Sequence, residues 1–411
     1  MKILLVNNVY NQGSTGKIIE DMRAGLEQRG LTVCVAYGRG RKVKSPHIYR
    51  LGGPILLKIQ SLFSKITGYA YRCSPITTYR LFKIIKKEQP DIVNIQCPNA
   101  NTLNLVQTIE YLKKHNIKTI LTSHTEFLYT GGCGHAFNCD QWKTGCIKCP
   151  QFKAPNSYCP KSFFFDRCKQ QWLELAQAYH NFKSLVIVGT SPWSVERMKV
   201  SPFFKRNEMV TIYNGLNTAI FKYYDTIGLR KKLRIGDKKV VLHVTPNFYS
   251  PLKGGRFVKE IAQRLINDAP NAVLIIVGYN GDGTDLPANT IPISHTQNQQ
   301  ELAMYYSLAH MTLLTSEREV FSMVCAESLC CGTPVIGFKA GGPESIAIPE
   351  YSTFVKYGDV DTLYQKILQY LNNEKISISI ERAHKFYSRE TMNDKYFKLI
   401  TRMFDTDYNN N

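Results

Sequence analysis

The sequence predicts an α/β protein made of two Rossmann-like domains. Strand-like apolar runs alternate with helical patterns along most of the 411 residues, which is typical of parallel sheets covered by helices. Runs such as VLIIVG at residues 273–278 are apolar almost without interruption, as expected for strands buried on both faces of a sheet. The chain is also too long for one ordinary hydrophobic core, so two domains of about 200 residues are expected.

The predicted elements divide between two sheets. The first sheet is predicted to contain the strands Lys2–Asn7, Thr32–Tyr37, Ile92–Gln96, Thr119–Ser123 and Leu185–Thr190, and the second Val240–Thr245, Ala272–Gly278, Met311–Thr315 and Thr333–Phe338. Helical patterns separate many of them, at residues 16–29, 79–88, 104–116, 255–268, 299–309 and 324–331. Residues 379–405 carry a long, charged, amphipathic pattern that predicts a final helix.

The domain seam is expected near residues 200–220, where Pro, charged residues and an Asn-Gly turn interrupt the pattern. We therefore predict an N-terminal domain over residues 1–205, which includes a cysteine-rich insertion, and a C-terminal domain over residues 206–385. Residues 386–411 are predicted to form a C-terminal helix, for which packing back on the first domain is one interpretation.

The charge of the chain is strongly positive and uneven. The net charge is +20, and residues 1–90 hold 16 Lys and Arg against four acidic residues. Such a charge attracts anionic surfaces, so an anionic membrane, a phosphorylated substrate, nucleic acid and simple solubility are the alternatives. Zinc-finger spacing, an aromatic strand signature and a basic heptad region are all missing from the sequence, so no nucleic-acid partner is expected.

Membrane spans and export signals are not apparent in the sequence. No apolar run reaches the ~20 residues that a transmembrane helix needs. The apolar run at Ile3–Val6 is too short for a signal peptide and is better interpreted as a buried first strand. We therefore expect a cytoplasmic protein, with peripheral contact to the inner face of the cytoplasmic membrane as one interpretation.

Residues 54–71, PILLKIQSLFSKITGYAY, allow two interpretations. Apolar side chains recur at helical spacing in this segment, with Lys58 and Lys65 to one side, at Ile55, Ile59, Leu62, Phe63 and Ile66. The pattern fits a basic helix that lies on an anionic lipid surface. It also fits an ordinary amphipathic helix that docks on the sheet through its apolar side.

The segment Ser316–Ser345 carries the strongest chemical signature. Seven residues separate Glu319 from Glu327, and a helix beginning near Ser322 would leave its first backbone N–H groups unpaired as a site for a diphosphate. A carboxylate before the helix can accept hydrogen bonds from sugar hydroxyls, and we assign this role to Glu319. A carboxylate along the helix can accept hydrogen bonds from two hydroxyls of a ribose, and we assign this role to Glu327. The further donor-contact residues predicted here are Phe321, Ser322, Met323 and Val324.

This segment resembles the signature of the retaining GT-B glycosyltransferases, a large family that includes sucrose-phosphate synthase-like and bacterial polysaccharide enzymes. The similarity comprises the two glutamates, the Gly-Thr-Pro-Val run and the Gly-Gly loop, whereas Val320, Ser322 and Ser328 stand where a small residue, Gly and Ala are usual. The resemblance implies two domains that face each other across a cleft, a nucleotide-sugar donor and transfer with retention of configuration.

Lys253 is the second residue that the resemblance marks. It lies before a helix in HVTPNFYSPLKGGRFVKEIA, where the family has a Lys that binds the donor phosphate beside an Arg a few residues earlier. That Arg is missing here, and Asn247 is the nearest polar candidate. A lysine in solvent without a donor contact is the alternative interpretation.

Two further positions lie in the first domain. His124 follows a predicted strand and is similar to the family's active-site His, which contacts the donor sugar; a buried structural His is the alternative. Gly13 and Gly16, in NQGSTGK, fit the family's Gly-rich loop or a plain tight turn. A P-loop would need Gly at Asn11, so we reject an ATPase or kinase function for this loop.

Four cysteines lie within 17 residues and are candidates for one tetrahedral zinc site: Cys133, Cys139, Cys146 and Cys149. Only the Cys146–Cys149 pair has common zinc-ligand spacing, so a structural zinc ion, reduced packing cysteines and disulfides all remain open. The block HTEFLYTGGCGHAFNCDQWKTGCIKCP resembles a subgroup of the family found in colanic-acid and O-antigen synthesis, and it is expected to form a lid or an acceptor loop.

Together these features predict an enzyme that transfers a sugar from a nucleoside diphosphate to a growing, lipid-linked bacterial surface polysaccharide. An Asp-rich metal motif is missing from the sequence, so no catalytic cofactor is expected. An inactive sugar- or lipid-binding scaffold and a basic, zinc-containing nucleic-acid binder are the alternative functions.

Overall fold

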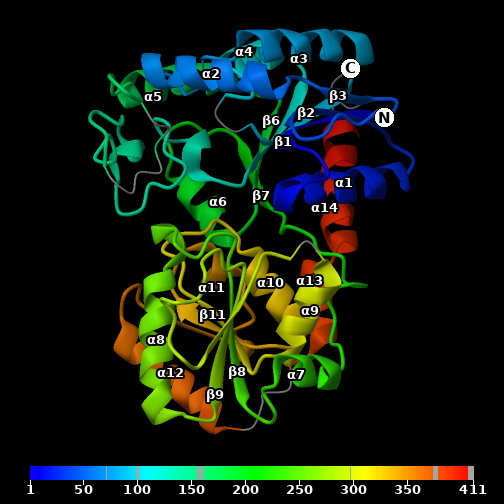
Figure 1. The fold of residues 1–411 in the computed structure, drawn as a ribbon. Helices are drawn as coiled ribbons and strands as arrows, with labels where there is room; N and C mark the ends of the chain where they lie inside the picture. Colours follow the sequence, from blue (N-terminus) through cyan, green and yellow to red (C-terminus); the bar gives the residue numbers. More distant parts are fainter. Residues whose placement is uncertain are drawn as a thin grey trace. The chain divides into compact units, whose positions relative to one another are not determined.

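The computed structural model describes residues 1–70, 72–98, 101–154, 159, 162–296, 298–373 and 378–405 (Figure 1). Two compact units make up the chain. The first contains Met1–Gly215 together with the C-terminal segment from Arg389, and the second contains Leu216–Ser388. Residue 71 of the predicted helix 54–71 and residues 406–411 of the predicted C-terminal helix lie outside the described residues.

The first unit contains a seven-stranded parallel sheet with the strand order β3-β2-β1-β4-β5-β6-β7. Its strands are β1 (Lys2–Val9), β2 (Thr32–Arg39), β3 (Ile48–Arg50), β4 (Ile92–Cys97), β5 (Lys118–Ser123), β6 (Leu185–Gly189) and β7 (Glu208–Thr211). The inner strands β4 and β6 are buried along their whole length, as their apolar composition predicts.

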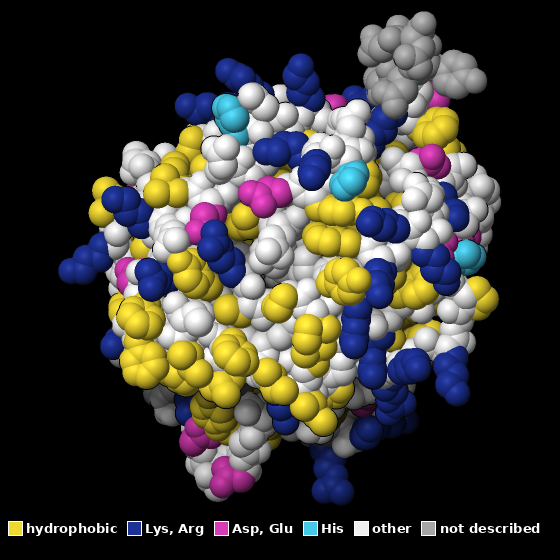
Figure 2. Space-filling view, turned by 90° about the horizontal axis from the view of Figure 1, so that it is seen from above, with side chains coloured by type: hydrophobic (Ala, Val, Ile, Leu, Met, Phe, Trp, Pro, Cys, Tyr) yellow, Lys and Arg dark blue, Asp and Glu magenta, His cyan; other side chains and the backbone are white. Residues whose placement is uncertain are grey.

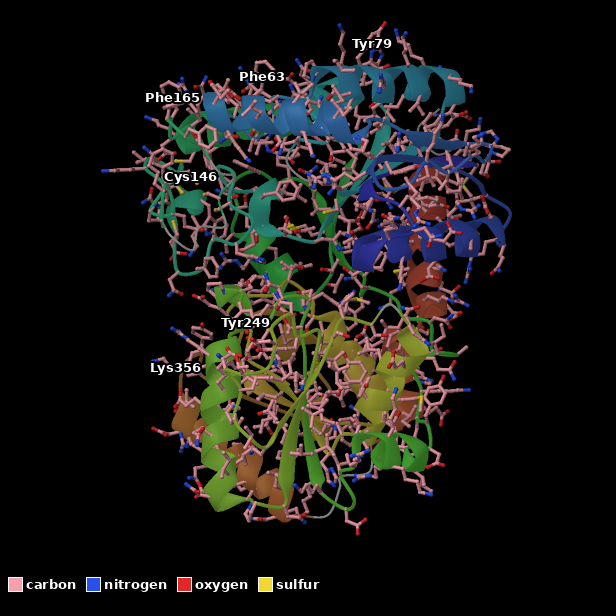
Figure 3. The ribbon with its side chains drawn as sticks, viewed as in Figure 1. Phe63, Tyr79, Cys146, Phe165, Tyr249 and Lys356 are labelled. Atoms are coloured by element: carbon pink, nitrogen blue, oxygen red, sulfur yellow. The ribbon has the colours of Figure 1, made fainter. Side chains whose placement is uncertain are left out.

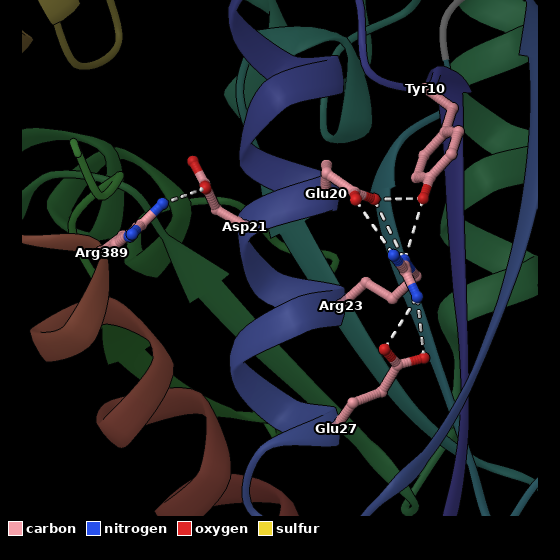
Figure 4. A network of polar contacts seen from close by, with 6 residues as sticks. All are labelled: Tyr10, Glu20, Asp21, Arg23, Glu27 and Arg389. Atoms are coloured by element: carbon pink, nitrogen blue, oxygen red, sulfur yellow. Dashed lines mark hydrogen bonds and ion pairs between the residues drawn. The ribbon is translucent and has the colours of Figure 1, made fainter. Parts of the chain in front are cut away.

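The helices of the first unit are α1 (Gly13–Glu27), α2 (Pro54–Thr67), α3 (Pro75–Glu88), α4 (Leu105–Lys114), α5 (Cys168–Tyr179), α6 (Pro192–Lys199) and α14 (Arg389–Asp405). The C-terminal helix α14 packs against α1. Arg389 binds Asp21 at 3.1 Å beside a second network on α1, in which Arg23 bonds to Glu20 and Glu27 (Figure 4). The Asn393 side chain packs directly against Gly25, where a Cβ atom would lie only 1.9 Å from Asn393 Nδ2.

The second unit contains a six-stranded parallel sheet with the order β10-β9-β8-β11-β12-β13. Its strands are β8 (Lys239–Val244), β9 (Ala272–Val277), β10 (Thr290–Ile293), β11 (Met311–Leu314), β12 (Val335–Phe338) and β13 (Ser352–Val355). Its helices are α7 (Ile227–Leu233), α8 (Gly255–Asp268), α9 (Gln299–Leu308), α10 (Met323–Cys330), α11 (Gly342–Ile346), α12 (Val360–Asn372) and α13 (Ile380–Tyr387). In Figure 1, α8 and α12 lie on one side of this sheet and α9, α10 and α13 on the other.

The nine predicted strands are all present, with ends within two residues of those expected. The four strands without a prediction, β3, β7, β10 and β13, are the edge strands of the two sheets.

The prediction of one unbroken helix over residues 379–405 is wrong. Ser388 is extended, with ψ 148°, and separates α13 from α14, because Leu216 N–H donates to the Tyr387 carbonyl at 2.7 Å and ties the chain to the second unit there.

Candidate functional site

The candidate site of the second unit lies where β8 and β11 pair side by side. The strand order reverses between them, and parallel sheets bind ligands at the carboxyl ends of strands at such a point. Lys253 follows β8 on a short 3₁₀ turn, Pro251–Lys253, and Glu319 follows β11. The two loops are joined, because Thr315 Oγ1 donates to the Lys253 carbonyl at 2.8 Å. Gly254, with φ +68°, allows this approach, since a Cβ would lie 2.3 Å from the Thr315 carbonyl oxygen.

Glu319 and Lys253 form an ion pair at this edge. Glu319 Oε1 accepts hydrogen bonds from Lys253 Nζ at 2.7 Å and from Ser316 Oγ at 2.6 Å, and the two charged side chains are 13% and 24% exposed. Burial raises the pKa of Glu319, but the Lys253 charge and the hydrogen bonds outweigh burial, so the pKa lies below its usual value. The site therefore holds an ionised carboxylate and an ammonium side by side.

The Gly-Gly loop after β12 fixes the backbone of Glu319. Glu319 N–H donates to the Ala340 carbonyl at 3.1 Å, and Gly342 N–H donates to the Glu319 carbonyl at 2.8 Å. A Cβ on Gly342 would lie 2.4 Å from the Val320 backbone, so only glycine allows this approach. The Glu344 carboxylate accepts from the N–H groups of Ala340 and Gly341 and closes the loop.

The helix α10 begins beside this pair. Its first residue is Met323, and the Ser322 side chain caps it by accepting from Cys325 N–H at 3.3 Å. Ser322 has φ +86°, which explains why the resembled family has Gly at this position. Because the Met323 and Val324 N–H groups precede the first i to i−4 bond of the helix, they are donors suited to an anion.

Glu327 lies further along α10. Its Oε2 accepts a hydrogen bond from the Tyr306 hydroxyl at 2.8 Å. Tyr306 is buried on α9, and burial and the charge of Glu327 raise its pKa, so the hydroxyl stays a donor. Sequence reasoning missed Tyr306, because nothing in its surroundings marks a partner 21 residues away.

Asn247 and Phe321 differ in their surroundings. Asn247 is exposed, its N–H donates to Thr245 Oγ1 at 3.2 Å, and its carbonyl accepts from Ser250 N–H. Phe321 is buried at the start of α10.

A second residue missed in the sequence is His243 on β8, which is 2% exposed and bonds through Nδ1 to the Leu313 carbonyl at 3.1 Å. Burial lowers the pKa of His243 to about 4.

In the first unit, residues of β4, β5 and α14 form the network that holds His124. Its Nε2 lies 2.9 Å from Gln96 Oε1, so Nε2 carries the proton and Nδ1 is left as an acceptor. Gln96 also donates to Tyr396 on α14 at 3.2 Å, and Tyr396 bonds to Thr122 at 3.1 Å. Burial lowers the pKa of His124 to about 4, so the ring is neutral at neutral pH.

Gly13 and Gly16 lie after β1, the strand beside β4 in the first sheet. Gly13 has φ +62° and begins α1. The loop closes tightly over Gly16, whose carbonyl accepts from Asn11 N–H at 2.9 Å, and a Cβ at Gly16 would lie 3.2 Å from Asn11 N. The loop therefore brings backbone, rather than side chains, to the carboxyl edge of the sheet.

The segment 54–67 forms α2 with its apolar side outward. The predicted apolar row is 40–75% exposed, whereas Leu57, Gln60 and Ser64 face the protein. The interpretation of α2 as a helix docked through its apolar row is therefore wrong. Among the described residues, no helix is both long and apolar enough to cross a membrane.

The twelve cysteines are all free thiols. The predicted zinc ligands line one small cavity together with Cys159 and Cys168. Within the described part of the chain, the one set of three potential ligand atoms that lie within 4.8 Å of one another belongs to Cys34, His47 and Glu88. Lys2 also binds Glu88, at 3.3 Å, so this set is a hydrogen-bond network around a buried carboxylate.

The sequence is similar to those of known glycosyl transferases. Residues 225–389 match the family model of the group 1 glycosyl transferases. A putative colanic acid biosynthesis glycosyl transferase of Escherichia coli is 19% identical over 98% of this chain and 100% of its own. The chain spans only about half or less of the length of the other curated relatives. It spans 53% of a relative that is 24% identical and 36% of one that is 30% identical.

Solved structures share the fold over the whole chain. The sucrose-phosphate synthase of Thermosynechococcus elongatus has a TM-score of 0.72 at 18% identity and covers 99% of this chain and 100% of its own. HepE of Anabaena has been solved with UDP and with UDP-glucose. Its UDP complex has a TM-score of 0.66 at 14% identity, and the match covers 98% of this chain and 100% of HepE. These structures confirm the prediction of two Rossmann-like domains of the GT-B class.

Proposed function

We propose that this chain is a GT-B glycosyltransferase and that it moves a sugar, with retention of configuration, from a nucleoside diphosphate sugar to a growing, lipid-linked polysaccharide. One observation carries the donor part of this proposal. Lys253 and Glu319 form an ion pair at the carboxyl edge of β8 and β11, beside the start of α10. The named relative from colanic acid synthesis supports polysaccharide assembly.

The residues divide the work of transfer between them. The leaving diphosphate gains negative charge as the sugar departs, and Lys253 and the first N–H groups of α10 are placed to stabilise it. Glu319, ionised and fixed by Lys253, can accept hydrogen bonds from sugar hydroxyls. Glu327, oriented by Tyr306, can accept hydrogen bonds from a ribose. Neutral His124 offers an acceptor for a further hydroxyl. Retention itself is supported by the family resemblance.

The donor is tested with nucleotide sugars. Purified protein should show a rise in melting temperature with one class among UDP-, GDP- and ADP-sugars, because a ligand that binds the native state stabilises it. UDP-sugars come first, since HepE has been solved with UDP and UDP-glucose. The same donor should release its nucleotide when a membrane extract supplies the acceptor. No stabilisation and no release with any of the three classes would contradict the proposal.

The outer face of the first unit supports a membrane-bound acceptor. The exposed row on α2 continues in Phe163, Phe164 and Phe165, which are 48–62% exposed, and in Ile76 and Tyr79 on α3. Phe63, Phe165 and Tyr79 point outward from the same end of this unit (Figure 3). The hydrophobic side chains form a band across this face, with Lys and Arg along its edge (Figure 2). We call this band the apolar face.

The charge around the apolar face favours anionic lipid over another apolar surface. Residues 51–90 hold seven Lys and Arg and one acid, Glu88, which is buried. A pocket of about 480 Å³ is lined by four cations, at Lys42, Arg50, Arg80 and Lys83. Apolar side chains that insert into the interface and cations that meet anionic headgroups are the two features of peripheral membrane binding.

Vesicle binding tests this part of the proposal. The protein should sediment with vesicles containing phosphatidylglycerol, and high salt should weaken binding because exposed charges are screened. Replacing both Ile59 and Phe63 with Asp should lower the partition more than about tenfold, since each buried apolar side chain contributes about 1.5–3 kcal/mol. Ile227→Asp, at a 60% exposed position on α7, is the matched control. Equal binding of the control and the double variant would contradict the membrane contact.

A further inference from the structure

The segment between β5 and α5 is long and contains little regular structure. Among its described residues, regular structure is confined to two 3₁₀ turns, Glu126–Leu128 and Gln141–Lys143. Loops of this length without helices or strands are uncommon in compact domains, because their ordering costs conformational entropy. Side-chain contacts therefore hold this segment, among them the buried rings of Tyr129 and Trp142 and the ion pair of Arg197 with the buried Glu126 at 2.6 Å.

Six thiols also meet where this segment joins α5. One cavity of about 10 Å³ is lined by Cys133, Cys139, Cys146, Cys149, Cys159 and Cys168, with Gly131 and Trp142 among its neighbours. A space of that size admits about one water molecule, and equally a single metal ion. Cys146 lies inside the first unit, and Cys133 and Cys168 are also buried (Figure 3). We call these residues the six-cysteine cluster.

Four of the six thiols form a chain of contacts. Cys149 Sγ lies 3.2 Å from Cys159 Sγ, closer than non-bonded sulfurs usually approach. The Cys149 thiol also interacts with that of Cys168, and the Cys159 thiol with that of Cys133. Cys139 and Cys146 stand outside this chain, and Cys146 Sγ instead accepts from Gly131 N–H at 3.3 Å.

We infer that the six-cysteine cluster is a structural zinc site and that its four ligands are Cys133, Cys149, Cys159 and Cys168. This set replaces Cys139 and Cys146 of the sequence-based prediction with two cysteines further along the chain. Four thiolates in tetrahedral geometry are a preferred zinc environment. Each thiol that binds gives up its proton, so four protons are released as one Zn²⁺ enters.

Zinc binding should also order the segment. Among the described residues, no three of the six sulfurs lie within 4.8 Å of one another, whereas zinc–sulfur bonds of about 2.3 Å hold all four ligands closer than that. The proposed ligand set therefore requires the four sulfurs to lie closer together than they do in the structure. Since Cys168 is the first residue of α5, the ion would join the loop after His124 to a helix of the core.

The inference does not depend on the donor site, and metal analysis tests it directly. Protein purified without chelator should contain about one zinc per chain. Cobalt in place of zinc should give the thiolate-to-metal absorption of a tetrahedral sulfur site. Strong chelation should lower the melting temperature and speed proteolysis between β5 and α5, and zinc should restore both. Absence of metal together with absence of the cobalt spectrum in folded wild-type protein would overturn the inference.

Single substitutions decide which thiols bind. Cys159→Ser and Cys168→Ser should lower the zinc affinity at least about tenfold, while Cys139→Ser should keep it. Cys73→Ser, a half-buried thiol of the same unit beside Thr67, is the matched control. Retention of zinc by Cys159→Ser with loss in Cys139→Ser would overturn the ligand set. Disulfides found by alkylation and mass analysis of freshly purified protein would overturn the site itself.

Discussion

The two units share one parallel-sheet architecture but use their side chains differently. In the second unit, the charged groups of interest are partly buried and bonded to one another at the strand ends, as Lys253 is to Glu319. In the first unit, the unusual features lie away from the sheet, on the exposed row of α2 and in the six-cysteine cluster. The family model covers residues 225–389, almost entirely within the second unit.

This difference indicates a division of function. A donor diphosphate has the same chemistry in many enzymes, and a preorganised pair of charges with a helix start suits it. The exposed row of α2 and the six-cysteine cluster have no counterpart among the described residues of the second unit, and under the proposed function the α2 row would serve the acceptor. Substitutions on α2 should therefore affect steps that substitutions at Lys253 and Glu319 leave unchanged.

The largest effect is expected from Glu319→Gln. The substitution keeps the shape of the side chain but removes the charge that fixes Lys253, so an interaction with the reacting sugar is lost. The turnover number should fall about 10²- to 10³-fold. Glu260→Gln, at an exposed position on α8, should change little. Turnover by Glu319→Gln at the rate of Glu260→Gln would remove Glu319 from the mechanism.

The double substitution of Ile59 and Phe63 by Asp should have the next largest effect, and only with a membrane-embedded acceptor. The apparent KM for such an acceptor should rise about tenfold, because the protein no longer concentrates at the surface. Donor binding should stay unchanged, since both side chains point into solvent. A parallel loss of donor affinity would contradict the separation of roles between the units.

Tyr396→Phe should have a smaller effect. It deletes the hydroxyl that bonds to Gln96 and Thr122, and Gln96 orients His124. The free energy of unfolding should fall by about 1 kcal/mol, and the turnover number a few-fold. Tyr223→Phe, at an exposed position, is the control. If Tyr396→Phe lowers stability but leaves turnover intact, Tyr396 only holds α14 in place.

The smallest effect concerns acid stability. Burial lowers the pKa of His243 to about 4 from its usual 6.5. Between pH 4 and 6.5, the His243 side chain therefore binds a proton in the unfolded chain but not in the folded protein. The contribution of this group is constant above pH 6.5, and stability is lost as the pH falls from 6.5 towards 4. The melting temperature of His243→Asn should therefore fall less between pH 7 and pH 5 than that of the wild type. His180→Asn, on the surface, should match the wild type over the same range.

The fold class and the inner strands could be predicted from the sequence because their signal is local. Buried strands are continuous apolar runs, and the carboxylate spacing around a helix start is visible without the fold. The edge strands β3, β7, β10 and β13 were missed because they are three or four residues long and only partly buried. Short edge strands carry little apolar pattern.

The remaining features depend on contacts between distant residues. The periodicity of α2 shows an apolar side but not whether that side faces the core or solvent. Tyr306 and Tyr396 reach Glu327 and Gln96 from other helices, and no spacing rule connects such pairs. The thiol of Cys159 likewise meets that of Cys149 only in the fold. Sequence reasoning therefore singled out the candidate groups and missed the residues that contact them.

Calorimetric titration with UDP tests the central claim, that the edge of β8 and β11 binds the donor diphosphate. Lys253→Ala should weaken UDP binding about 10- to 100-fold, because a hydrogen bond to a charged group contributes about 1.5–3 kcal/mol. Lys366→Ala, a lysine on α12 that contacts Gln369, should bind UDP as the wild type does. If Lys253→Ala binds UDP as tightly as Lys366→Ala, the donor site lies elsewhere.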